Sequence, residues 1–276
     1  SVITTATASA MIDVPTVEVL DAMLFEHSIT APAQGPDAIE QCCVYKLRDD
    51  PPMAAEAAKA VSATAAGLQC LFEWLRAALA ESIHDPTPYF KKRDTLLEIA
   101  GHCGQHSPAT VINLIEQLGL QDLLIDAVLK QPCFNGRAGA VTLLGYTRTQ
   151  NRRFVTALQS ALTDTAEVQS AALVMVQRLR QVDAGILAQV LDLIDAEDAA
   201  LAYAASRLLS LMARHERTSG SDRRTILRTL STALKRTDAK RPVCAFEHDS
   251  GSMWIRQVGT LAQRHYQSLL DIAGIV

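Results

Sequence analysis

The sequence predicts an all-α protein in which antiparallel helix pairs stack into an α-solenoid. The chain of 276 residues is 49% hydrophobic but only 5% aromatic. Its abundant alanine and leucine suit closely packed helices better than a sheet. In much of the chain, apolar residues recur with the period of one helix face. Two different helices also repeat their apolar stripes at a shared spacing of 33 residues, which indicates a repeat architecture.

The repeat is clearest between residues 137 and 236. One helical stripe within 164–180 consists of Val168, Ala172, Met175 and Leu179. At a spacing of 33 residues, the same positions hold Leu201, Ala205, Leu208 and Met212. The preceding helices repeat as well, and their matched residues are Phe154, Leu158 and Ala161, then Leu187, Leu191 and Ile194, then Ile226, Leu230 and Ala233. The last step is 39 residues, and the polar loop 217–222 accounts for the additional six.

Two segments, 154–179 and 186–212, resemble the HEAT-repeat pattern. Each has a second helix, a short turn with Asp164 or Asp195, and then the first helix of the next pair. The resemblance implies stacked antiparallel helix pairs in a right-handed superhelical array. Because HEAT patterns are degenerate, the resemblance implies a fold and no particular activity.

The chain departs from the HEAT pattern at one position. The family usually has an arginine after the first apolar residue of a repeat, where this chain has Gln169 and Ala202. Only Ile255-Arg256 matches, which argues against a regular Asp–Arg ladder between repeats. Beyond 137–236, we expect a further helix over 252–272 and a diverged unit over 91–130.

All 276 residues are expected to form a single elongated helical domain. In that domain, residues 1–12 are a tail, 13–136 hold diverged repeats, and 137–276 hold the clearer repeats. The other expected helices cover 15–27, 37–48, a long stretch from Pro51-Pro52 to a stop at 85–88, then 93–102, 108–118 and 120–130. The apolar face of each pair needs a neighbour to cover it, which predicts one continuous core.

Charge is distributed unevenly along the chain. Residues 1–136 carry 8 Lys and Arg against 17 Asp and Glu, whereas residues 137–276 carry 18 against 13. The six cysteines include no CxxC pair, which favours free buried thiols in a reducing compartment. No basic segment precedes an apolar stretch at the amino terminus, and charged residues interrupt the most apolar region, 53–80. We therefore expect a cytoplasmic protein that does not enter a membrane.

One cluster has the residue types of a metal site. His102 and His106 are four residues apart, and Glu98 extends the same line. However, Gly101 and Gly104 disfavour a helix there, and zinc needs three or four ligands in fixed geometry. The sequence therefore predicts no metal site.

A second cluster has residue types that serve in covalent catalysis, namely Cys244, Glu247, His248 and Asp249. They lie within six residues of one another, which rarely positions a catalytic triad. Iron-dependent hydroxylases of HEAT-like architecture use several His-Glu pairs, and this chain has only His215-Glu216. There is also no P-loop and no dinucleotide-binding fingerprint. We expect no catalytic residue and no cofactor.

A basic cluster is the preferred candidate for a binding surface. Residues 204–241 contain ten Lys and Arg against three Asp and Glu. Arg224, Arg228 and Lys235 share one helix face, and the repeat alignment puts Arg152 at the position equivalent to Arg224. Second helices usually line the concave surface of a HEAT solenoid, so these residues are predicted to form a basic, partner-binding groove. The alternative is a solvated helix face.

The segment from Asp238 to Ser252 has little helical signal and is expected to be a long loop. Its candidate partner-contacting residues are Lys240, Arg241, Phe246 and His248.

These features favour a non-enzymatic protein–protein interaction scaffold, and the partner that the basic cluster favours is an acidic protein. One alternative is a nucleic-acid-binding HEAT-like protein, including one related to DNA-repair glycosylases. Against it, the basic helix has no interleaved aromatic residues for base stacking. Another alternative is the sensor region of a multidomain signalling ATPase.

Overall fold

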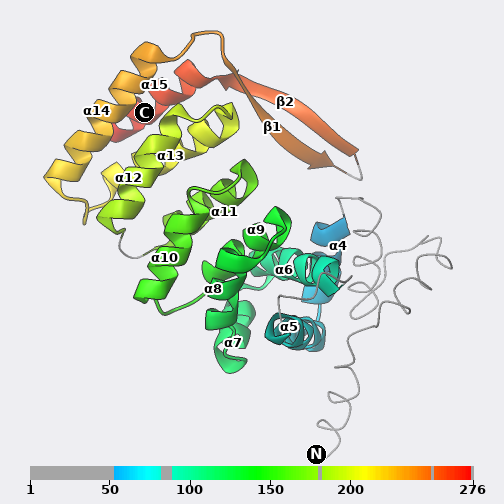
Figure 1. Ribbon diagram of the computed structural model, residues 1–276. Helices are drawn as coiled ribbons and strands as arrows, with labels where there is room; N and C mark the ends of the chain where they lie inside the picture. The colour runs from blue at the N-terminus through cyan, green and yellow to red at the C-terminus, as the bar shows by residue number, and fades with distance from the viewer. Residues whose placement is uncertain (1–52, 82–88, 180–181, 250–251, 275–276) are drawn as a thin grey trace, which may run out of the picture. The chain divides into compact units, whose positions relative to one another are not determined.

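The computed structural model describes residues 53–81, 89–179, 182–249 and 252–274 (Figure 1). This part of the chain is mostly helical, which confirms the predicted all-α class apart from one β-hairpin. The expected helices at 15–27 and 37–48, the tail at 1–12 and the stop at 85–88 lie outside the described residues. No helix in the described ranges is long and apolar enough to cross a membrane.

The chain divides into two compact units that meet in sequence after Ala161. The predicted single elongated domain stays a prediction. The described helices of unit 1 are α4 (Met53–Ser62), α5 (Ala65–Ala80), α6 (Tyr89–His106), α7 (Pro108–Gln117), α8 (Gln121–Lys130), α9 (Phe134–Leu144) and α10 (Arg152–Ala161). The elements of unit 2 are α11 (Ala166–Arg178), α12 (Ala184–Asp192), the 3-10 turn η1 (Leu193–Asp195), α13 (Ala199–Arg214), α14 (Gly220–Arg236), β1 (Pro242–Asp249), β2 (Ser252–Thr260) and α15 (Leu261–Ala273).

The long helix expected from Pro51-Pro52 to the stop at 85–88 is divided, in its described part, into α4 and α5. The Thr64 hydroxyl caps α5 by accepting a 3.0 Å hydrogen bond from the Gly67 amide. A side chain at Gly67 would come within 2.7 Å of the Val61 carbonyl oxygen, so the break needs glycine there. The large apolar residues of α5 from Leu68 to Leu79 form a buried stripe.

The expectation that glycines end the helix near residue 101 is wrong, because α6 continues through Gly101 and Gly104 to His106. These glycines allow close packing with α9 and the segment after it. A Cβ on Gly104 would clash with the Tyr146 ring, and a Cβ on Gly139 of α9 would lie 2.6 Å from the Leu97 backbone. Close packing of α6 on α9 thus outweighs the cost of about 1 kcal/mol for each glycine in a helix.

The predicted first-helix stripes are confirmed in unit 2 at their first three positions, whereas the fourth residues, Leu179 and Met212, are half-buried. Val168, Ala172 and Met175 of α11 are buried, as are the matching residues of α13, which are Leu201, Ala205 and Leu208. Their spacing is 33 residues.

The predicted second-helix register is wrong for α12. Its deeply buried residues are Ile186 and Val190, whereas Leu187 and Leu191 are half-buried. The third predicted residue, Ile194, lies in η1 and is buried as predicted. The stripes of α10 and α14 are buried as predicted. The step from Phe154 to Ile186 is therefore 32 residues and the step from Ile186 to Ile226 is 40. Each buried residue of α12 is followed by a leucine, so that Ile186-Leu187 and Val190-Leu191 are two apolar pairs. Hydrophobicity alone therefore did not show which residue of each pair points inward.

The segment expected as a loop over 238–252 and a helix over 252–272 is instead a β-hairpin followed by α15. Strands β1 and β2 pair antiparallel, with an irregularity between Val243 and Cys244. Ile255-Arg256 lies on β2, so its match to a helical repeat position is wrong. Helix α15 starts only after Thr260, where Thr260 and Gln263 form a capping box.

Candidate functional site: the basic face of helix α14

Helix α14 is fixed in unit 2 by its amino-terminal cap and by one buried stripe. The Ser219 hydroxyl accepts a 3.0 Å hydrogen bond from the Asp222 amide and donates a 2.7 Å hydrogen bond to the Asp222 carboxylate. Ile226, Leu230 and Ala233 are fully buried. With 3.6 residues per turn, these three side chains define the inward side of the helix.

Three basic residues lie on the opposite side of α14. Arg224, Arg228 and Lys235 are all exposed, and their spacing places them directly opposite the buried stripe. Within the described residues, none of the three side chains has a hydrogen-bond or ion-pair partner. Asp222, at the first turn, is the one acidic residue of α14. We call Arg224, Arg228 and Lys235 the basic face of α14.

The other two arginines of α14 support the fold. The Arg223 Nε donates a 2.8 Å hydrogen bond to the Ala213 carbonyl at the end of α13. Arg236 forms a 2.7 Å ion pair with Asp195 of η1. The helix thus uses Arg223 and Arg236 for contacts within unit 2 and leaves three cationic groups in water.

Arg152, the fourth predicted groove residue, is the first residue of α10 and is exposed. It belongs to unit 1, whereas α14 belongs to unit 2. A common groove that includes Arg152 therefore stays a prediction.

The four candidates of the predicted loop have different environments. Lys240 is exposed in the turn before β1. Arg241 is half-buried, and its guanidinium donates hydrogen bonds to the carbonyls of Ala196, at 2.9 Å, and Glu197. Arg241 therefore anchors the base of the hairpin. Phe246 and His248 lie on β1, where their backbones pair with Ile255 and Met253; their side chains lie outside the description.

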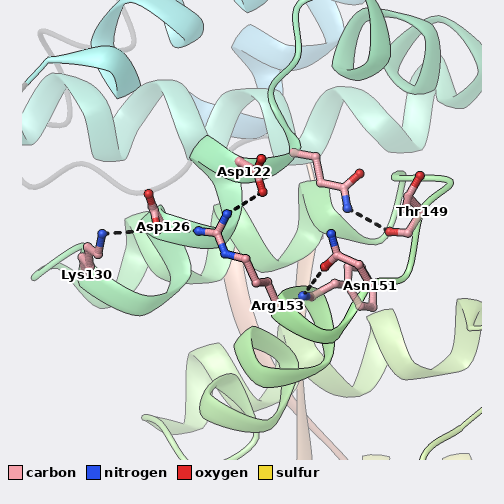
Figure 2. Close-up of polar contacts among 8 residues, drawn as sticks. Asp122, Asp126, Lys130, Thr149, Asn151 and Arg153 are labelled. Atoms are coloured by element: carbon pink, nitrogen blue, oxygen red, sulfur yellow. Dashed lines mark hydrogen bonds and ion pairs between the residues drawn. The ribbon is translucent and has the colours of Figure 1, made fainter.

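An ion-pair network on α8 and α10 was missed from the sequence. Arg153 contacts Asp122 at 2.7 Å and Asp126 at 3.1 Å, and Asp126 also pairs with Lys130 at 3.3 Å (Figure 2). The aspartates are four residues apart, so both face Arg153 of the neighbouring helix. Arg153 therefore joins α10 to α8 within unit 1 through contacts that the repeat pattern did not predict. Each such exposed pair contributes about 1 kcal/mol or less.

A buried polar cluster in unit 1 also escaped the sequence analysis. Asp94 of α6 is 8% exposed and accepts a 2.8 Å hydrogen bond from the Gln131 Nε2. Its carboxylate lies against Gly136, in the first turn of α9, and the Cys133 thiol hydrogen-bonds to it. Burial raises the pKa of Asp94 to about 6, against the opposing effect of these hydrogen bonds and of Arg93. The cluster links α6 to the start of α9.

Cys103 and Cys133 of unit 1 are poor nucleophiles. Burial raises the pKa of Cys103 to about 11. The pKa of Cys133 is raised as well, first by burial and then by the adjacent Asp94 charge. Both thiols are therefore protonated at neutral pH, whereas a reactive cysteine needs its thiolate.

The metal-like cluster has a geometry that differs from the prediction, since His102 and His106 lie on one helix, α6. Even so, the described residues contain no group of three or more His, Cys, Asp or Glu side chains that could hold a metal ion. Of the second cluster, Cys244 is half-buried on β1; the side chains of Glu247, His248 and Asp249 lie outside the description.

Comparison with known proteins found no family model that matches the chain and no curated protein with significant sequence similarity. The described residues are mostly helical with one β-hairpin, and the clearest candidate site among them is the basic face of α14.

Proposed function

We propose that this chain is a non-enzymatic helical scaffold that binds an acidic protein partner through the basic face of α14. The proposal rests on the observation that the basic residues of α14 fall into two groups, one with contacts inside unit 2 and one exposed to solvent. Arg223 and Arg236 are engaged within unit 2, whereas Arg224, Arg228 and Lys235 are exposed without partners in the described residues. Such a cluster of one sign attracts and orients a partner of the opposite sign.

The geometry of this face favours an acidic protein segment. With a rise of 1.5 Å per residue, Arg224 and Arg228 are separated by about 6 Å along the helix axis, and Arg228 and Lys235 by about 10 Å. Carboxylates along a partner helix recur at similar intervals. The residues between the cations include Thr225 and Thr232, whose hydroxyls donate to carbonyls one turn back. No aromatic residue occurs in α14, which disfavours binding of single-stranded nucleic acid by base stacking.

We also propose that the helix pairs form a HEAT-like solenoid. The support for this architecture is the 33-residue register shared by the buried stripes of α11 and α13. A solenoid offers an extended surface to a partner.

The test is an affinity capture by the full chain, compared with capture by the triple variant Arg224→Glu, Arg228→Glu, Lys235→Glu. The matched control is Lys59→Glu, Arg76→Glu, Arg207→Glu, which changes the net charge equally at exposed sites outside α14. We expect acidic proteins that are retained by the wild type and the control and lost by the α14 variant. Proteins captured equally by all three chains would contradict the proposal.

Nucleic acid is the competing outcome. Purified chain is titrated with duplex and single-stranded oligonucleotides at low salt, and binding is repeated at increasing salt concentration. Steeply salt-dependent binding that the α14 variant abolishes and the control retains would assign the basic face to phosphates instead.

A further inference from the structure

Helices of unit 2 border a partly open pocket, which we call the hollow. None of the residues of the basic face of α14 lines it. Its volume is about 410 Å³, and its walls come from α11, α12, α13 and α14. Val176, Leu208 and Ile226 are the buried apolar part of the wall. Leu187, Leu211 and Met212 are half-buried. The size and the apolar lining fall in the range of small-molecule sites. Because aliphatic side chains remain partly in water there, an apolar ligand would gain by covering them.

The mouth of the hollow has hydrogen-bond donors and a positive charge. His215 Nδ1 accepts a 3.2 Å hydrogen bond from the Arg217 backbone amide, so the neutral ring carries its proton on Nε2 and can donate. The Arg217 side chain is exposed and has no partner among the residues described. Both residues also line an adjoining, wider depression with Arg214 and Glu216.

The negative groups near the mouth are largely engaged. The Asp222 carboxylate accepts a 2.7 Å hydrogen bond from Ser219 and lies in the first turn of α14, where the helix dipole offsets its charge. At the end of α13, the Met212 carbonyl accepts a hydrogen bond from the Thr218 hydroxyl. Glu216 is exposed and is outnumbered by Arg214 and Arg217 in the wider depression. This arrangement favours an anion over a cation.

We propose that this hollow binds a small amphiphile that consists of an aliphatic chain and an anionic headgroup. The chain lies against Leu187, Leu208 and Leu211, and the headgroup is held by Arg217 and the Nε2 of His215. The site is independent of the proposed partner surface, because the basic face of α14 lies on the opposite side of that helix from Ile226.

The test is calorimetric titration of the full chain with three eight-carbon probes: octanoate, octyl phosphate and octylammonium. We expect saturable binding of the two anions and much weaker binding of octylammonium. The tighter of the two anions then shows whether a carboxylate or a phosphate headgroup fits. Absence of saturable binding, or equal binding of octylammonium, would overturn the proposal.

Two variants locate the site. Arg217→Gln is expected to weaken binding of both anions about tenfold, because a charge-assisted hydrogen bond is lost, and the exposed Arg207→Gln is the matched control. Leu187→Trp is expected to occupy part of the hollow, where the aliphatic chain would lie, and so to weaken binding. If Leu187→Trp does not fold, the Arg217→Gln variant still tests the site. Binding of the anions by Arg217→Gln at the wild-type affinity would refute the proposal. The triple variant of α14 should bind octanoate like the wild type, which separates this proposal from the partner surface.

Discussion

The buried carboxyl of Asp94 predicts an unusual dependence of stability on pH. Burial raises the pKa of Asp94 from an ordinary 3.8 to about 6. The folded protein therefore prefers the protonated carboxyl, and its contribution to stability is complete below about pH 4 and is lost as the pH rises through 6. A shift of this size corresponds to about 3 kcal/mol. Asp94→Asn has no such proton, so its stability relative to the wild type should rise by about 2 kcal/mol between pH 4 and pH 7.

Urea unfolding followed by tryptophan fluorescence measures this difference. Trp74 is buried in α5 of unit 1, and Trp254→Phe removes the second tryptophan of the chain, so that the signal reports on unit 1. Other titrating groups cancel when the Asp94→Asn variant is compared with its parent at each pH. Asp192→Asn, an exposed aspartate of unit 2, is the control for loss of one carboxyl. A difference that stays constant with pH, or that falls as the pH rises, would refute the reasoning.

Three further predictions concern the packing at Gly139, the helix cap at Thr64 and the buried histidine His265. Gly139→Ala should destabilise the protein by about 1–3 kcal/mol, because the new Cβ would lie 2.6 Å from the Leu97 backbone. The control is Gly220→Ala, whose new Cβ would meet only the end of an arginine side chain, at 3.9 Å, and should not destabilise the protein. Thermal unfolding compares the two variants. Thr64→Ala should cost about 1 kcal/mol through loss of the α5 cap, measured in the same way. His265 is fully buried, and neither of its ring nitrogens has a hydrogen-bond partner in the described structure. Burial lowers the pKa of His265; the negative charge of Asp195 raises this pKa, and the positive charge of Arg241 lowers it. The unfolded chain therefore binds the proton more readily, stability is lost as the pH falls below about 6.5, and His265→Leu should remove this loss in urea titrations at pH 5 and 7.

The sequence predicted the helices best where small and large apolar residues alternate in one fixed register. The stripes of α11, α13 and α14 were found because the inward residues are separated from polar residues on the other face. The same separation predicted correctly that Arg224, Arg228 and Lys235 share one exposed face. Local periodicity is sufficient for such surfaces, because a helix determines by itself which residues point outward.

The features that were missed depend on contacts between distant residues. Helix α6 continues through Gly101 and Gly104 because another segment of the chain occupies the space beside them. The hairpin depends on pairing of β1 with β2, and its short apolar runs resemble those of a helix. The Asp94 cluster joins residues 37 positions apart in sequence, and no local pattern indicates such a pair.

The most direct test of the proposed partner surface is a charge exchange with the acidic protein that the capture experiment recovers. Its carboxylates that contact the basic face are replaced by lysine, and equilibrium binding is measured against the wild-type chain and against the variant Arg224→Glu, Arg228→Glu, Lys235→Glu. We predict weak binding when only one side is changed and recovery when both are changed, because the attraction between the two surfaces is then restored with opposite signs. Loss of binding without recovery in the exchanged pair would contradict a direct contact through this face.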